Sequence, residues 1–180
     1  VDLVVNNAGA FHRQTLLEAE DMSFARNEMD TNYFGMLAMV RAFAPVLAGN
    51  GGGAIVNILS EAARLNAPFV GAYSASKAAA WSLTQGVRAE LRAQGTHVLA
   101  AFPSSTDTAM LAGLDGDKES PGDIAEGIID GFLHRCQQCL ARIVKAEQVT
   151  VLGEELAYRD LPLLLRHRFG GGDRPGPGLL

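Results

Sequence analysis

A tyrosine and a lysine one helical turn apart carry the clearest chemical signal in the chain. Tyr73 and Lys77 stand in the segment YSASK, and a spacing of four residues places both side chains on one face of a helix. An ammonium group beside a phenol favours the phenolate, so the pair predicts a Tyr73 pKa lowered from its usual value of about 10. Such a phenol can act as a general acid or base. Taken alone, a pair with this spacing is more often a structural feature of a solvated helix.

Two further polar residues, Ser60 and Asn32, fit the same chemistry. Ser60 lies thirteen residues before Tyr73, at the end of a predicted strand, where its hydroxyl could help to bind a developing oxyanion. Asn32 falls inside a predicted helix, although the asparagine side chain competes for backbone hydrogen bonds and disfavours helices. A residue that breaks a local rule in a regular element is a hint of function. The candidate catalytic residues are Asn32, Ser60, Tyr73 and Lys77.

The elements that must position these residues read as α/β units. Short apolar runs at residues 1–5, 54–59 and 97–102 are separated by longer segments with helical periodicity, which is typical of a parallel sheet. The second and third runs are almost continuously apolar, as expected of strands that helices cover on both faces. The sequence therefore predicts an α/β fold with a doubly wound parallel sheet. Residues 143–144 and 149–152 are candidates for a last strand.

Helices are predicted between and after these strands. An apolar stripe at spacings of three and four residues marks a long helix over residues 21–48; its members are Met29, Tyr33, Met36, Val40, Phe43 and Leu47. A second helix is predicted over residues 70–94, with Gly95 just past its end, and a third from Ile124 to about residue 138. The glycine-rich run at 49–53 is interpreted as a turn, because no Lys-Ser/Thr follows it and it leads into a strand.

Small polar residues follow each predicted strand at its carboxyl end. Asn6-Asn7-Ala8-Gly9 follows the first strand, Ser60 the second, and the segment from Pro103 to Thr108 the third. Ligands bind outside the carboxyl ends of the strands in an open parallel sheet, so these residues suit a flat polar ligand lying across the sheet. For any one of these segments taken alone, ordinary turn chemistry is the more common explanation, because Asn, Gly, Ser and Pro dominate turns.

Composition narrows the class of protein. The net charge of −5, with basic residues scattered along the chain, argues against nucleic-acid binding. No apolar run approaches the roughly 20 residues of a membrane span and no signal peptide is visible, so we expect a soluble cytoplasmic protein without membrane partners. Cys136 and Cys139, with His134 nearby, form neither a disulfide scaffold nor a complete zinc site, and no metal is predicted. We expect one domain over residues 1–169 and a disordered Gly/Pro-rich tail over 170–180.

The motifs together resemble those of the classical short-chain dehydrogenase/reductase (SDR) family. The matching residues, in order along the chain, are Asn6-Asn7-Ala8-Gly9, Asn32, Ser60, Tyr73-x-x-x-Lys77 and Pro103 to Thr108. The likeness covers residues 1 to about 135, and five motifs in register are far more specific than any one of them. It implies a Rossmann-like fold and an NAD(P)-dependent oxidoreductase that interconverts an alcohol and a carbonyl by hydride transfer.

The resemblance also implies a role for each matched residue. Tyr73 would exchange a proton with the substrate oxygen, and Ser60 would polarise that oxygen. Lys77 would lower the Tyr73 pKa while bonding the nicotinamide ribose, and Asn32 would hold a water that relays protons to Lys77.

Cofactor contacts are implied at the ends of the first and third strands. Besides Tyr73 and Lys77, the residues expected to bind NAD or NADP are Asn7, Ala8 and Gly9 on the adenosine side and Pro103, Thr106 and Thr108 on the nicotinamide side. Ser104 stands where the family usually has glycine, which places a hydroxyl near the nicotinamide.

The chain differs from the family most at its beginning. The family's glycine-rich loop, which holds the pyrophosphate at a helix N-terminus, and its first three strands do not precede Val1. Residues 1–5 would match the family's fourth strand and would form an unpaired apolar edge. We therefore expect an N-terminally truncated piece of a longer enzyme, which alone binds NAD(P)H weakly or not at all.

The sequence also gives expectations about the substrate, the oligomeric state and competing functions. The resemblance implies a small-molecule alcohol or carbonyl substrate and a homodimer or homotetramer paired through the helices at 21–48 and 70–94. The segment between Thr108 and Pro121, with Met110, Leu111 and Leu114, is interpreted either as a partly apolar substrate loop or as an ordinary surface loop. A non-catalytic interaction module is the competing hypothesis. A serine hydrolase is disfavoured because Ser60 lacks a GxSxG context.

Overall fold

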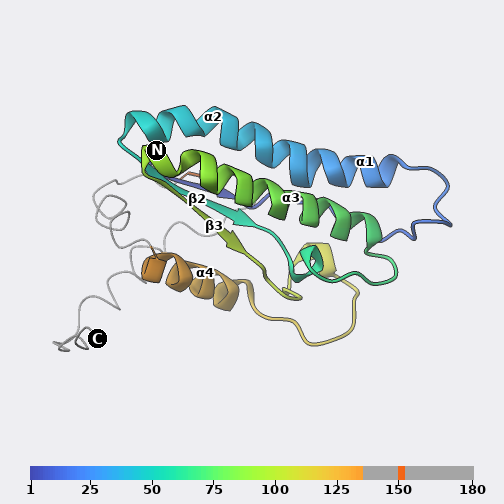
Figure 1. The fold of residues 1–180 in the computed structure, drawn as a ribbon. Helices are drawn as coiled ribbons and strands as arrows, with labels where there is room; N and C mark the ends of the chain where they lie inside the picture. The colour runs from blue at the N-terminus through green and yellow to red at the C-terminus, as the bar shows by residue number, and fades with distance from the viewer. Residues whose placement is uncertain (136–149, 153–180) are drawn as a thin grey trace, which may run out of the picture.

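A parallel sheet with helices on both faces forms the described part of the chain, residues 1–135 and 150–152 of a computed structural model (Figure 1). The strand order is β3-β2-β1-β4. The strands are β1 (Leu3–Asn6), β2 (Gly53–Ile58), β3 (Thr96–Ala101) and β4 (Thr150–Leu152). The predicted fold class is confirmed, and the three main strands lie within two residues of their predicted ranges.

Strand β1 is not the unpaired edge that the sequence predicted. On one side it pairs with β2, and on the other it pairs in parallel with β4, where Val4 lies opposite Thr150 and Asn6 opposite Leu152. The expectation was wrong because it considered only the segment before Val1 as a source of a partner strand. A short apolar run near the other end of the chain supplies one instead. The candidate strand at 149–152 is thus confirmed over 150–152, whereas residues 143–144, Cys136, Cys139 and the tail lie outside the described residues.

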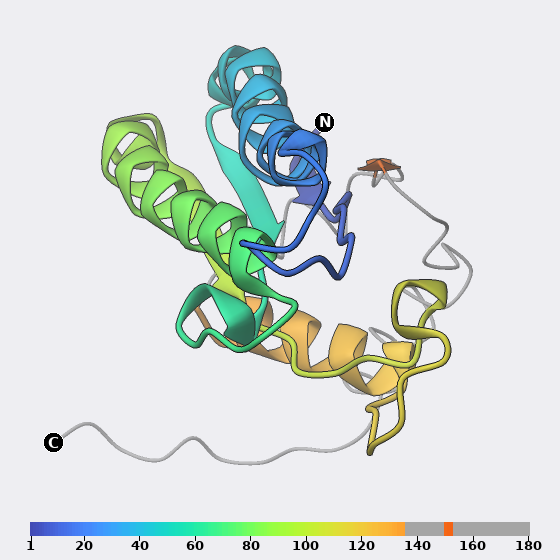
Figure 2. The ribbon, with the colours of Figure 1, turned by 90° about the vertical axis from the view of Figure 1, so that its right-hand side faces the viewer.

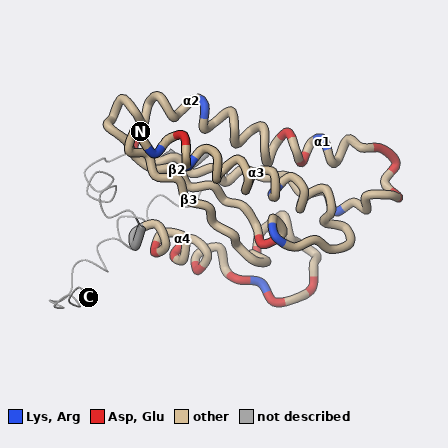
Figure 3. The backbone as a smooth tube through the Cα atoms, in the orientation of Figure 1, with Lys and Arg blue, Asp and Glu red and all other residues tan. Residues whose placement is uncertain are grey.

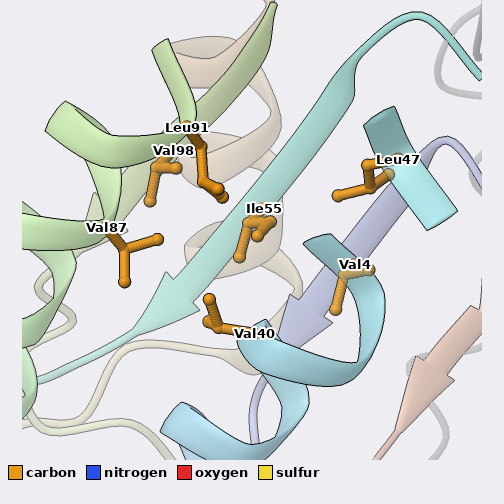
Figure 4. Packing of buried hydrophobic residues seen from close by; sticks show 7 residues of the cluster. All are labelled: Val4, Val40, Leu47, Ile55, Val87, Leu91 and Val98. Carbon is orange, nitrogen blue, oxygen red and sulfur yellow. The ribbon is translucent and has the colours of Figure 1, made fainter. Parts of the chain in front are cut away.

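The predicted long helix is a continuous run with an irregular centre. It consists of α1 (Ser23–Met29), a π-helical turn η1 (Asp30–Gly35) and α2 (Met36–Gly49). The predicted stripe faces the sheet, since Met36, Val40 and Leu47 are buried. Figure 4 shows Val40 and Leu47 pointing toward Ile55 and Val4 in the main apolar cluster.

A second helix lies beside the first on the same face of the sheet. It is α3 (Gly71–Glu90), extended by a 3₁₀ turn, η3 (Leu91–Gln94), and it ends at Gly95 with a left-handed φ of 74°. Figures 1 and 2 show α3 running next to α1 and α2. Ala72, Ser76 and Ala80 are buried, so the small residues of α3 allow close helix packing inside the chain.

The opposite face of the sheet is covered by α4 (Pro121–Arg135), which the sequence predicted (Figures 1 and 2). Phe132 and Ile128 pack against Ala54 and Val56 of β2, whereas Ile55 between them faces the other cluster. This alternation explains the continuous apolar sequence of β2, because both of its faces are buried.

The glycine run after α2 is a turn, as predicted. Gly52 has φ of 104°, and a Cβ atom there would lie 2.3 Å from the backbone oxygen of Gly95. Only glycine fits where these two turns meet.

Lys and Arg are interspersed among several elements rather than gathered on one of them (Figure 3). None of the helices in the described part of the chain combines the length and apolar character required to cross a membrane.

A chain of hydrogen bonds between buried amide and hydroxyl groups links two neighbouring strands to α3. Asn6 Nδ2 donates to Asn57 Oδ1 at 2.8 Å, and Asn57 Nδ2 donates to Thr84 Oγ1 at 2.9 Å. Asn57 and Thr84 are fully buried, and Thr84 Oγ1 in turn donates to Ala80 O at 2.7 Å. These buried hydrogen bonds therefore join β1, β2 and α3.

Removal of the central amide should destabilise the fold. Asn57→Ala leaves Asn6 without its acceptor and Thr84 without its donor, so we expect the free energy of unfolding to fall by about 2–4 kcal/mol. Urea denaturation followed by circular dichroism measures the change. Asn66→Ala, at an exposed loop position, is the control and should cost less than about 0.5 kcal/mol. Equal stability of the two variants would contradict this interpretation.

Candidate active site

The structure brings Tyr73 and Ser60 together at the carboxyl end of β2. Ser60 has extended backbone (φ −167°), and its Oγ accepts from Ala62 N at 3.1 Å to cap the short helix η2 (Glu61–Ala63). Tyr73 lies in the first turn of α3, and its phenol is close enough to Ser60 for a hydrogen-bonding interaction between them to lower the Tyr73 pKa. A serine hydroxyl and a phenol thus meet where a substrate oxygen could contact both.

Lys77 is buried beside the same phenol. Its side chain is 3% exposed, and Nζ lies 5.7 Å from the centroid of the Tyr73 ring. Nζ donates to Ile58 O, the last residue of β2, at 3.0 Å. Burial lowers the Lys77 pKa from 10.5 to about 8. Because an ammonium has three donors and one is used here, the others could bind ligand hydroxyls.

The Tyr73 pKa differs from the sequence expectation. Burial of the phenol is the main cause that raises this pKa, and the charge of Glu28 also raises it, whereas the hydrogen bond with Ser60 lowers it. The prediction that Lys77 lowers the Tyr73 pKa was wrong for this structure. Lys77 lies over the ring and directs Nζ to a backbone carbonyl, and desolvation of the phenol dominates.

Asn32 sits in the π-helical turn and ties three segments together. Its Oδ1 accepts from Ala10 N at 2.8 Å, and its Nδ2 donates to Ala10 O at 3.0 Å and to Ser76 Oγ at 2.8 Å. Ser76 Oγ donates onward to Tyr73 O at 2.8 Å. The sequence predicted a regular helix here, with Asn32 as a functional residue; the structure has a π-helical turn, a feature that is frequent at functional sites. The water relay expected of Asn32 stays a prediction.

The backbone at Gly9 passes close to the side chains of Lys77 and Asn32. A Cβ atom at Gly9 would lie 3.4 Å from Asn32 Oδ1, 3.6 Å from Lys77 Nζ and 3.8 Å from Met110 Cε. The first strand end therefore reaches the Tyr73–Lys77 pair, with Asn7 half-buried and Ala8 exposed. Met110, in the short helix η4 (Ala109–Leu111), brings the predicted substrate loop to the same place.

The segment after β3 is held by its own hydrogen bonds and by Glu119. Thr106 Oγ1 donates to Ser104 O at 3.2 Å, and Thr108 Oγ1 donates to Thr106 O at 3.5 Å. Ser104 Oγ donates to Glu119 Oε2 at 2.7 Å, so the hydroxyl that replaces the family's glycine has a partner within the chain. Pro103 O accepts from Glu61 N at 3.1 Å, which links this segment to η2. The Thr hydroxyls bond to backbone oxygens of this segment rather than to Tyr73 or Lys77.

Two residues near Tyr73 were missed from the sequence. Phe11 packs its ring against the Tyr73 ring, with centroids 4.9 Å apart, and Glu28 is a carboxylate only 1% exposed. Glu28 could have been found from the sequence, because it lies four residues before Asn32 and therefore on the same helical face. Phe11 carried no signal, because its contact with Tyr73 depends on how residues 10–12 fold back.

Comparison with known proteins identifies the family of this chain. The family model for short chain dehydrogenase matches residues 1–119. The chain belongs to the short chain dehydrogenase family. It is 36% identical over 132 residues to dehydrogenase/reductase SDR family member 7B of Xenopus laevis. That alignment covers 73% of this chain and 41% of the relative, so the chain spans about two fifths of that protein's length.

Solved structures of dehydrogenases share the fold. A short chain dehydrogenase from Burkholderia cenocepacia in complex with NADP matches with a TM-score of 0.68 and 34% identity, covering 96% of this chain and 70% of that chain. A 7α-hydroxysteroid dehydrogenase complexed with NADH and 7-oxo glycochenodeoxycholic acid matches with a TM-score of 0.65 and 27% identity, covering 74% and 56% respectively. The predicted SDR resemblance is confirmed.

The burial of Lys77 predicts a pH dependence of stability. The Lys77 pKa is depressed in the folded chain, so the folded state binds fewer protons than the unfolded state between about pH 8 and pH 10.5. Desolvation of Lys77 therefore costs stability in full below about pH 8, and this cost is removed progressively as pH rises from about 8 to about 10.5. Between pH 7 and pH 9.5 we expect the unfolding free energy to rise by about 2 kcal/mol more in the wild type than in Lys77→Met.

Urea denaturation at both pH values measures this difference. Lys118→Met, at a half-buried lysine that bonds Leu111 O, is the control and should keep the wild-type slope. Parallel pH dependences for the wild type and Lys77→Met would show that Lys77 is not desolvated.

Proposed function

We propose that Tyr73 is the general acid and base of an NAD(P)-dependent oxidoreductase that interconverts a small-molecule alcohol and a carbonyl. The observation that carries the proposal is the position of the Tyr73 phenol, which lies close to Ser60 and is flanked by the buried Lys77. Family membership supports the reaction class, since the similar structures are named as dehydrogenases.

The protonation of Tyr73 favours the acid role in carbonyl reduction. With a raised pKa, the phenol is protonated at neutral pH and can donate its proton to the substrate oxygen as that oxygen becomes an alcohol. Ser60 Oγ donates a hydrogen bond to the same oxygen while negative charge develops on it. In the reverse direction the phenol must first lose its proton to act as a base, and Lys77, which is neutral above its pKa of about 8, can accept that proton.

The strand ends fit a dinucleotide. The glycine at position 9 leaves space beside Lys77 Nζ, whose unused donors could bond the hydroxyls of a ribose. Asn7, Ala8 and Gly9 would line one part of NAD or NADP, and Pro103, Thr106 and Thr108 the other. The bound cofactor supplies the hydride. Asn32 acts in this proposal by holding Ala10 and Ser76, and hence the backbone around Tyr73.

The proposal extends to assembly. Phe34 and Val46, on the run from α1 to α2, are 52% and 42% exposed, which fits pairing of two copies through this helix. A homodimer or homotetramer therefore accompanies the proposed activity.

Replacement of the phenol tests the proposal. We expect Tyr73→Phe to lower kcat by about 100-fold or more, because it removes the transferred proton and leaves the ring in place. Turnover is followed as the change in NAD(P)H absorbance with panels of alcohols and carbonyl compounds. It is measured in this chain and in a version that includes any coding sequence before Val1, and cofactor fluorescence reports binding separately.

Tyr33→Phe is the matched control. Tyr33 is half-buried and packs edge-on against Phe34 at 4.9 Å, so its hydroxyl should be dispensable. Unchanged turnover in Tyr73→Phe would refute the general acid role. Cofactor-independent partner binding with no turnover in any form would instead favour the non-catalytic interaction module.

A further inference from the structure

Glu28 is a buried carboxylate that the chemistry above does not use. It is 1% exposed, and its Oε1 accepts from His12 N at 2.7 Å. Its Oε2 is buried without a hydrogen-bond partner, and no cationic group pairs with it among the residues that the structure describes. A half-satisfied buried carboxylate is costly, which makes a purely structural role a poor explanation.

Glu28 and Asn32 hold one short segment of backbone from the same helical face. Asn32 binds both backbone groups of Ala10, and Glu28 binds the amide of His12. Phe11 lies between these two anchored residues, and its ring contacts the Tyr73 ring at 4.9 Å and 49°. Glu28 and Asn32 therefore fix the position of the Phe11 ring, against which the Tyr73 ring packs.

We propose that Glu28 is a positioning residue for Tyr73. Its carboxylate accepts from the His12 amide and so fixes the backbone that carries the Phe11 ring. A contribution of Glu28 to catalysis rests on the proposed function of Tyr73. The contacts of Glu28 with the backbone are independent of that function.

The charged groups around Tyr73 come from two helices and one loop. Lys77 of α3 lies 5.7 Å from the ring centroid, and Glu28 of α1 is close enough for its charge to raise the Tyr73 pKa. The imidazole of His12 is exposed and bonds Asn27 Oδ1 at 2.8 Å. Burial and the Glu28 charge both raise the Tyr73 pKa, so loss of that charge should lower it.

A titration of the phenol tests the proposal without cofactor or substrate. The chain is labelled with ¹³Cζ-tyrosine, and Tyr73→Phe assigns the Tyr73 resonance. Glu28→Gln retains an oxygen that can accept from His12 N but removes the charge. We expect the Tyr73 midpoint to fall by about 1 pH unit or more in this variant. Asp30→Asn, at an exposed carboxylate two residues further along the helix, should leave the midpoint unchanged.

An unchanged midpoint in Glu28→Gln, or an equal shift in Asp30→Asn, would overturn the proposal. If the wild type or a variant unfolds at a pH below the Tyr73 midpoint, amide hydrogen exchange in the wild type at neutral pH tests the proposal instead. The His12 amide should be protected although the His12 side chain is exposed, and rapid exchange would overturn the proposal. Absence of turnover affects only the proposed function, because neither measurement needs the reaction.

Discussion

The side-chain amide of Asn32 is the interaction on which the site depends. It is buried, and its three hydrogen bonds join the segment after β1, the π-helical turn and α3. Through Ser76 the same network reaches the backbone carbonyl of Tyr73. An amide side chain can accept from Ala10 N and donate to Ala10 O at the same time, which an apolar side chain in this position could not do. The network fixes the elements before any ligand is bound.

Desolvation is the second constraint, and it acts on Lys77 and Tyr73. Burial lowers the pKa of Lys77 and raises that of Tyr73, while Glu28 remains a buried carboxylate with one free oxygen. Each of these groups would be more stable in water. Clusters of this kind are typical of functional sites, where stability is exchanged for groups with pKa values suited to proton transfer.

Much of this arrangement could be predicted from local sequence. The continuous apolar runs predicted β2 and β3, the three-and-four stripe predicted the long helix, and Asn32 inside that predicted helix was a hint of function. These features depend on neighbours in the chain. The spacing of Tyr73 and Lys77 likewise predicted their shared face.

The features that the sequence did not predict depend on distant contacts. Pairing of β1 with β4 joins residues near opposite ends of the chain. Lys77 bonds the carbonyl of Ile58, and Phe11 meets Tyr73 only because its loop folds back. The pKa of Tyr73 follows from burial, which a spacing of four residues does not reveal.

A double-mutant cycle between Asn32 and Ser76 tests the central claim most directly. The free energy of unfolding is measured by urea denaturation for the wild type, Asn32→Ala, Ser76→Ala and the double variant. If the amide joins the two helices, the losses will not add, and the coupling free energy will be about 1–2 kcal/mol. Additive losses, with a coupling below about 0.3 kcal/mol, would contradict the claim that Asn32 fixes the helix that carries Tyr73.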